Sequence, residues 1–294
     1  MPRPQPVPRR FRTGLRAGVA SLLAVCLAVS GAVAVAGDPA SGPDGLAMRV
    51  ESEVTSGGGT EPLARSLTLF RDGVAWNFLE LPHDGAGSRL ELVEIALHDP
   101  ARERIVVVDP VRNLKTEVAA VRLERLGVSL AKWARESDDR LVRWAGGPDF
   151  DSGLVEDEDG RLELAGPRVR YAVTHAAAPS PAAAAAYRRF ADGAILLKAL
   201  LHPGGVPPFP RLALNRQLEA AGAIPEQVTL EIEPRLGPLA GRPERLTSTH
   251  RVHPRLLAAD LSRIEEAEAH VAAARAVDLA TFAGPAAEAT RHDP

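Results

Sequence analysis

Residues 65–79, RSLTLFRDGVAWNFL, carry the clearest structural signal of this chain. Two strand-like runs flank the Asp-Gly pair at 72–73, and such a pair favours a two-residue hairpin turn because both positions tolerate positive φ. Side chains on a strand alternate between its faces, so Val74, Trp76 and Phe78 share one face of the second run. The stretch therefore predicts a β-hairpin whose second strand carries a bulky apolar face.

The hairpin lies inside a longer series of strand signals. Residues 46–55 alternate between apolar and polar side chains, which is typical of a half-buried strand. Two further apolar runs stop at Asp-Pro pairs, at 99–100 and 109–110, and this pair favours a turn because proline cannot donate to a ladder. Residues 46–118 therefore predict an antiparallel meander. The run at 105–108 is apolar on both faces, so we expect cover on both sides.

Helices are expected to supply that cover. Thr116-Glu117 is placed to cap a helix through Gly127, and the helical pattern continues to Trp144 with Trp133 on the same apolar stripe. The pattern beyond it predicts strands at 161–164 and 168–175, helices at 179–201 and 211–221, strands at 227–233 and 244–252, and a helix at 254–278. Without a repeat or a linker, these elements predict one α+β domain over 46–280 and a frayed tail over 281–294.

The N-terminus has the features of an export signal. Five arginines and no acidic residue in the first sixteen positions precede the apolar run 17–36, which ends in Ala34-Val35-Ala36. We therefore expect a signal peptide over 1–36, a flexible leader over 37–45 and an exported protein of the periplasm or cell envelope. The alternative is an uncleaved anchor, since twenty such residues are just long enough to span a bilayer.

Composition excludes several classes of function. The single cysteine, Cys26, lies inside the expected signal, so its removal would leave no disulfide, thiolate nucleophile or cysteine-ligated metal. Loss of the five arginines would take the formal charge from −3 to about −8. Nucleic-acid binding needs clustered positive charge, and we expect none here.

Three short motifs suggest chemistry but fail on spacing. His250 and His253 stand three apart on an expected strand, so they point to opposite faces, and we expect exposed histidines rather than a metal site. The acidic run from Asp149 lacks the glycine and glutamate positions of a calcium loop. Ser129 lacks the strand that a nucleophile elbow requires. We therefore expect no metal, no cofactor and no enzyme activity, with a hydrolase as a third-ranked alternative.

Aromatic side chains are the best candidates for a binding site. A sheet that is apolar on both faces leaves one face to be filled once helices cover the other. The candidate residues that would line a ligand cavity there are Val74, Trp76, Phe78, Trp133, Trp144 and Tyr171. The alternative is that these side chains are ordinary core.

The hairpin at 69–78, with Pro82 after it, resembles that of the LolA/LolB-like superfamily of exported lipoprotein and lipid carriers. The strands ending at the two Asp-Pro pairs fit the same meander, so the resemblance covers about residues 46–118. It implies a strongly curved antiparallel half-barrel closed by helices over an apolar cavity, with Trp76 and Phe78 lining it. The helix at 179–201 and the final helix depart from the family pattern.

Two functional hypotheses follow from these features. The first is a non-catalytic envelope protein that binds an apolar small molecule or lipid and contacts the membrane only transiently or through an uncleaved signal. The second is a structural or protein-interaction domain of the envelope whose core is filled by its own side chains, with another envelope protein as its partner.

Overall fold

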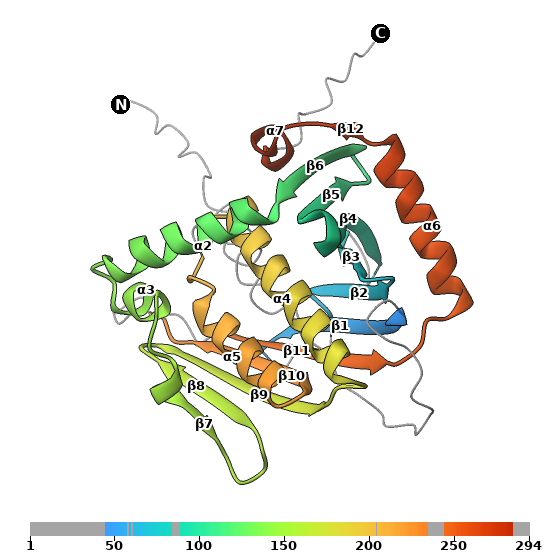
Figure 1. The fold of residues 1–294 in the computed structure, drawn as a ribbon. Helices are drawn as coiled ribbons and strands as arrows, with labels where there is room; N and C mark the ends of the chain where they lie inside the picture. Colours follow the sequence, from blue (N-terminus) through green and yellow to red (C-terminus); the bar gives the residue numbers. More distant parts are fainter. Residues whose placement is uncertain are drawn as a thin grey trace, which may run out of the picture.

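The computed structural model of the chain describes residues 45–57, 59, 61–83, 89–203, 205–234 and 244–284. The expected signal peptide at 1–36 lies outside the described residues, as do 37–44 of the leader and 285–294 of the tail. The described part is a mixed α+β structure in which helices pack on a large sheet (Figure 1).

The strands of the described residues form one open sheet. Its order is β12-β6-β5-β4-β3-β2-β1-β11-β10-β9-β8-β7, antiparallel except for β12 beside β6. The strands are β1 Met48–Ser56, β2 Ala64–Arg71, β3 Val74–Pro82, β4 Leu90–Asp99, β5 Arg104–Asp109, β6 Leu114–Ala119, β7 Leu154–Glu156, β8 Leu162–Gly166, β9 Val169–Ala177, β10 Ala223–Ile232, β11 Glu244–His253 and β12 Arg275–Ala276. The helices are α2 Ala120–Arg135, α3 Arg140–Ala145, α4 Pro181–Leu201, α5 Phe209–Ala220, α6 Ala258–Ala273 and α7 Leu279–Ala283.

The hairpin and the meander are confirmed. β2 and β3 pair in antiparallel register around Asp72 (φ 52°) and Gly73 (φ 78°), the positive angles that the Asp-Gly pair predicts. β4, β5 and β6 follow in sequence order. β1 also pairs with β11 from the far end of the chain, with Val50 opposite Val252, and this pair joins the meander to the β7–β11 half.

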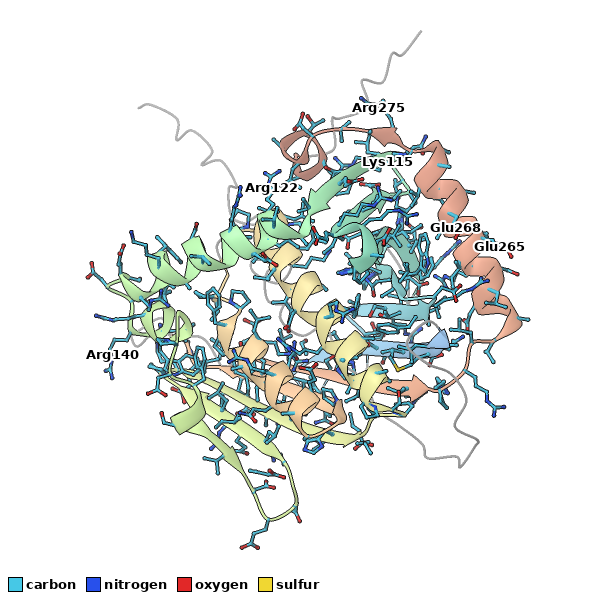
Figure 2. The ribbon with its side chains drawn as sticks, in the orientation of Figure 1. Lys115, Arg122, Arg140, Glu265, Glu268 and Arg275 are labelled. Carbon is cyan, nitrogen blue, oxygen red and sulfur yellow. The ribbon has the colours of Figure 1, made fainter. Side chains whose placement is uncertain are left out.

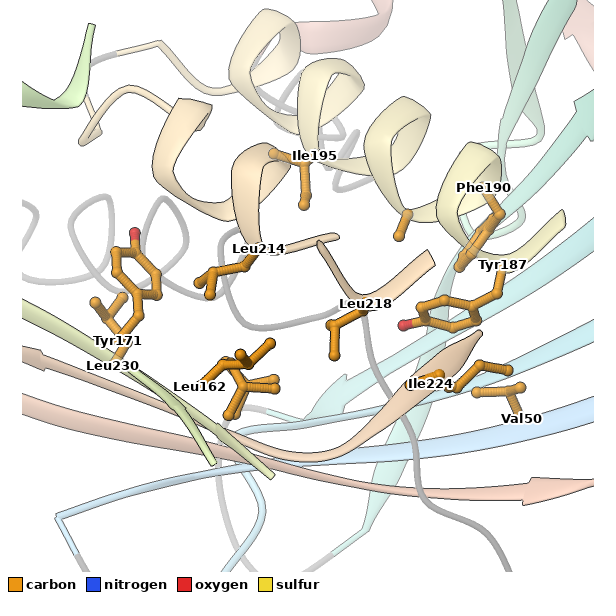
Figure 3. Packing of buried hydrophobic residues seen from close by; sticks show 14 of the residues in the cluster. Val50, Leu162, Tyr171, Tyr187, Phe190, Ile195, Leu214, Leu218, Ile224 and Leu230 are labelled. Atoms are coloured by element: carbon orange, nitrogen blue, oxygen red, sulfur yellow. The ribbon is translucent and has the colours of Figure 1, made fainter. Parts of the chain in front are cut away.

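Different helices cover the two faces of the sheet. α4 and α5 lie across one face, where Tyr187, Phe190 and Leu214 pack on β1, β10 and their neighbours (Figures 1 and 3). α6 covers β2–β5 on the opposite face through Ile264 and Ala267 (Figure 1). Both faces of β5 are thus covered, as its apolar sequence predicts.

The predicted long helix over 116–144 is wrong in two respects. Thr116 and Glu117 belong to strand β6, and α2 begins only after Ala119. The helix also ends at Arg135, because the Asp139 carboxylate accepts hydrogen bonds from the first backbone amides of α3 and starts a separate helix. Strand β7, which sequence patterning missed, pairs with β8 across the acidic turn at 157–161.

The C-terminal end also differs from expectation. α6 stops at Ala273, five residues before the predicted end, because the chain turns to place β12 beside β6. Phe282, expected in a frayed tail, is buried in α7 against the sheet. Arg112 holds it there: its guanidinium lies 5.5 Å from the Phe282 ring centroid and donates to the Phe282 carbonyl at 2.6 Å. Tertiary contacts therefore order a segment that local sequence marks as a tail.

Candidate functional site: a cavity between helix α4 and the sheet

A row of cross-strand partners forms the floor of a cavity. Phe70 on β2 pairs with Ala75 on β3, Ala75 with His98 on β4, and His98 with Ile105 on β5. All four side chains line the cavity, on the face of the sheet that carries α4. Direct partners on neighbouring strands project to the same side, so the register alone assembles this floor.

Helix α4 forms the roof. Its first turn is fixed by Ser180, whose hydroxyl accepts from the Ala183 backbone amide, and by Pro181 at the first helical position. Ala186, Phe190 and Gly193 then fall at spacings of four and three residues, which places them on one side of the helix facing the floor. The first turn of α2, from Ala120 to Glu124, closes the side.

Small side chains make the space. Ala75, Ala120, Ala186 and Gly193 stand where larger residues would fill the layer between helix and sheet. The resulting cavity has a volume of about 630 Å³. Ligand pockets of proteins run from ~300 to 1,000 Å³, so this one is large enough for a small organic molecule.

His98 is the buried polar group of the floor. Its ring packs edge-on against Phe190, with ring centroids 4.8 Å apart, and its Nε2 makes no hydrogen bond to any described residue. Burial lowers the pKa of His98 to about 3, because the imidazolium form would lose its hydration. At neutral pH the ring is therefore uncharged and keeps one donor and one acceptor. His98 also lines a second, much smaller cavity of about 20 Å³.

Charged groups surround the mouth. Burial alone would raise the pKa of Asp99, but hydrogen bonds from Arg102 outweigh it and hold that pKa below its ordinary value. The Asp99 carboxylate accepts from the Arg102 guanidinium at 2.7 Å, and Arg104 donates to Glu117 at 2.7 Å. Among the lining charges, Glu103, Glu124 and Arg189 are exposed and have no ion-pair partner within the described residues. The mouth thus offers both signs of charge to solvent.

The structure separates the six predicted cavity residues. Val74, beside the β2–β3 turn, lines the cavity mouth. Trp76 and Phe78 point to the other face of β3, where they pack under α6, and Arg263 lies 4.7 Å from the Phe78 ring centroid. The period of two explains this: Trp76 cannot share a face with Ala75.

The other three aromatic residues are spread more widely. Tyr171 is buried in the α4–α5 core. Trp144 packs edge-on against Phe150, with centroids 5.3 Å apart, at the far end of that core. Trp133 is 55% exposed on α2, away from the buried side that Leu123 and Ala134 form, and Trp144 lies on the separate helix α3, so the two tryptophans do not share the expected stripe. The six residues therefore do not form one site.

Sequence reasoning missed His98 and the small residues around it. A lone histidine before an Asp-Pro turn carries no distinctive signal, and alanines in an Ala-rich helix look like helix formers rather than cavity walls. The available signal was the contrast along β3, where Ala75 stands opposite the bulky Trp76 face.

The expectation of two exposed histidines is wrong for His250. It is buried, and its Nδ1 lies 2.9 Å from the Ser52 hydroxyl. Burial first, and the nearby charge of Arg211 second, hold the pKa of His250 well below its usual value. His253 is exposed, as expected. No group of three or more histidine, cysteine or acidic side chains suited to a metal occurs in the part of the chain that the structure describes.

A second buried polar cluster joins α4 to α5 and has a structural explanation. The Asn215 amide donates to Asp192 at 2.8 Å, and Arg188 donates to both Asp192 and Glu219. Burial raises the pKa of Asp192 despite these partners. Most of the groups are paired with one another between two packed helices, so the cluster fixes the positions of α4 and α5.

Comparison with protein-family models and with curated proteins finds no match for this chain. Among the described helices, none has the length and apolar character needed to cross a bilayer.

Proposed function

We propose that this protein is an exported, non-catalytic carrier of the cell envelope, and that the cavity beneath α4 binds an apolar ligand such as a lipid or acyl chain. The observation that carries the proposal is the 630 Å³ cavity, floored and roofed by apolar side chains and containing one uncharged histidine. A ligand pocket typically combines apolar walls with a few polar groups that orient the ligand.

The lining favours binding over chemistry. The described residues around the cavity include no serine, threonine, cysteine or lysine, and the unpaired carboxylates of Glu103 and Glu124 stand exposed to solvent at the mouth. Both oxygens of the Asp99 carboxylate accept from Arg102 and cap the turn that follows β4. His98 is left as a hydrogen-bonding anchor for a carbonyl, hydroxyl or carboxyl group at one end of the ligand.

The apolar walls are sufficient to hold an acyl chain. Each buried methylene contributes ~0.8 kcal/mol, so burying about ten of them is worth ~8 kcal/mol before the cost of ordering the chain. Micromolar binding corresponds to about the same free energy after such costs are subtracted, so we expect binding weaker than micromolar from ten methylenes alone. In this proposal the open sheet is the strongly curved half-barrel of the LolA/LolB-like carriers. The antiparallel order of β1–β6 and the helices across one face support it.

The alternative is a structural or protein-interaction domain of the envelope, and one observation favours it. Trp76 and Phe78, which the carrier resemblance would place in the cavity, are packed under α6 instead. If the cavity is no more than a packing gap, the core is largely self-filled and the partner would be another envelope protein.

Two measurements separate the carrier from the structural alternative. One is displacement of a fluorescent fatty acid, and the other is mass spectrometry of lipid extracted from the purified protein. Ala186→Trp projects an indole into the cavity and should abolish probe binding. Ala182→Trp, one turn earlier on an exposed position of the same helix, is the matched control and should bind normally. Absence of both probe binding and extracted lipid in the wild-type protein would favour the structural alternative.

A further inference from the structure

Helix α2 presents an unusual outer face. Val121 is 47% exposed, Val128 73% and Trp133 55%. These three are the largest group on one element among the seven large apolar side chains that stand exposed in the described residues; Leu257 and Leu261 form a pair at the start of α6, and Val111 and Val155 stand alone. The opposite side of the helix, centred on Leu123 and Ala134, is buried against the rest of the protein, so the outer apolar residues are not needed for packing.

The same face is basic. α2 carries four cations and one acidic residue, in a chain whose formal net charge is −3. Arg122, Arg125 and Lys132 are exposed, and none has a side-chain hydrogen bond or ion pair within the part of the chain that is described. Figure 2 shows Arg122 extending from the outer side of the helix into solvent.

Helical spacing interleaves the two kinds of side chain. Val121, Arg125, Val128 and Lys132 follow one another at intervals of four, three and four residues and form one stripe. A neighbouring stripe consists of Arg122, Ser129 and Trp133, which are seven and then four residues apart. Apolar and cationic groups therefore alternate along the full length of the outer face, hereafter the α2 face, defined by Val121, Arg122, Arg125, Val128, Ser129, Lys132 and Trp133.

We propose that the α2 face binds the surface of an anionic lipid bilayer. Interfacial helices combine lysine and arginine with tryptophan and aliphatic residues, so that cations contact phosphate groups while apolar side chains enter the headgroup region. Tryptophan prefers this depth because its ring is apolar and its N–H is polar. A nucleic acid would use the cations but would leave Val121 and Val128 without an apolar partner.

The α2 face adjoins the cavity without depending on it. Val121 belongs to the face and also lines the cavity, so docking would bring the cavity mouth to the bilayer surface. Membrane binding by the α2 face holds whether or not the cavity carries a ligand. The test therefore uses vesicles without added ligand, and its outcome is independent of the fatty-acid displacement assay.

The experiment is co-sedimentation of the full chain with vesicles of phosphatidylcholine, alone or mixed with phosphatidylglycerol. The test variant is Arg122→Gln, Arg125→Gln, Lys132→Gln. The matched control removes the same charge from exposed, unpaired arginines on other elements: Arg251→Gln, Arg255→Gln, Arg275→Gln. Residues 1–36 are common to all three proteins, so any membrane contact they make cancels in the comparison.

We expect the wild type to bind the anionic vesicles and the test variant to bind roughly a hundredfold more weakly, because each of the three basic residues contributes about fivefold at an anionic surface. The control triple should bind like the wild type. Brominated lipid should quench tryptophan emission in the wild type, and Trp133→Phe should remove most of the quenching, because Trp76 and Trp144 are covered.

Equal binding by the test and control triples would overturn the proposal, and so would an absence of quenching at Trp133. Binding to duplex DNA at the same salt concentration, with no binding to anionic vesicles, would also overturn it in favour of a nucleic-acid surface. Matching thermal melts of the three proteins establish that the variants fold.

Discussion

Strand β3 has two faces that the molecule uses in opposite ways. Trp76 and Phe78 point toward α6 and are packed into a filled core, whereas Ala75 on the other face opens onto the cavity under α4. Neighbouring residues of one strand thus contribute to a solid layer on one side and to a hollow one on the other. In this strand the aromatic side chains lie where the core is filled, and the small side chain lies where space is left.

The largest change in stability should come from truncating a side chain on the face of β3 that packs under α6. Trp76→Ala removes a buried indole under α6, and we expect the free energy of unfolding in urea to fall by ~3–5 kcal/mol, the usual cost of a large-to-small core change. Fatty-acid binding should persist, because the residue faces away from the cavity. Trp133→Ala, at an exposed position, is the control and should stay within ~0.5 kcal/mol. A small loss at Trp76 with impaired binding would place its side chain at the cavity instead.

Acid should act on the α4 side, where the buried histidines lie. His98 and His250 have lowered pKa values when folded, so between the ordinary histidine pKa and the folded value the unfolded chain binds more protons. Stability is therefore complete above pH ~6.5 and falls as the pH drops. At about pH 5.5 each histidine should cost about 1 kcal/mol relative to about pH 7.5.

Urea unfolding at those two pH values checks this expectation. The carboxylates with lowered pKa values, such as Asp99, still carry their charge at the lower pH, so they do not contribute. The double variant His98→Gln, His250→Gln removes the two buried histidines and should lose most of the change. The remainder is assigned to His202, whose pKa burial also lowers. If the free energy of unfolding of the double variant falls by the same amount at low pH, the pH dependence comes from other groups.

A larger side chain in the cavity under α4 should have an intermediate effect on stability. A Cβ at Gly193 would lie 3.1 Å from Nδ1 of His98 and 3.4 Å from Cδ1 of Ile105, so Gly193→Val presses on the floor. We expect a loss of ~1–3 kcal/mol by overpacking, and loss of fatty-acid binding.

The control is the helical glycine of α2. At Gly127 a Cβ would meet Leu196 at 3.8 Å, an ordinary contact, so Gly127→Ala should gain ~0.5–1 kcal/mol and leave binding unchanged. Normal probe binding by Gly193→Val would show that the ligand, if any, does not lie between α4 and the floor.

The smallest change in stability should come from a partly exposed residue at the edge of the contact between α6 and β3. Arg263 stacks over Phe78 and donates to Glu80 at 2.8 Å, but its side chain is partly exposed. Arg263→Met keeps the aliphatic stem and removes the charge, so we expect a loss of ~1 kcal/mol or less. Urea unfolding at low and high salt measures it. A loss above that of Trp76→Ala would mean that the charge, rather than packing, holds α6 to the sheet.

Local patterning was sufficient for most of the elements. The Asp-Gly turn, the two Asp-Pro stops and the alternation along β1 depend on neighbours a few residues away, and each is found where the sequence predicts it. The missed break between α2 and α3 follows from the local cap at Asp139, but the failures at the C-terminal end lie where a distant segment intervenes. α6 ends early because its continuation pairs beside β6, and Phe282 is ordered by Arg112, which lies 170 residues earlier.

The candidate site was harder to predict than the fold. Alternation along β3 identified one bulky face, but nothing local to β3 indicates that α6, which begins some 180 residues later, fills it. The cavity lies on the opposite face of β3. It forms because the register of four strands aligns its floor and helix α4 lies above that floor. Trp133 shows the same limit: a helical stripe indicates which residues share a face, but not whether another element covers that face.

Local sequence was sufficient for the meander and for the alternation that puts Ala75 and Trp76 on opposite sides of β3, because turn chemistry and side-chain period act within a few residues. The export signal at the N-terminus stays a prediction. The packing of distant elements places α6 against one side of β3, leaves space under α4 on the other, and keeps a basic and apolar face of α2 in solvent. Burial is a property of two surfaces in contact, and the second surface here comes from a part of the chain far from the first.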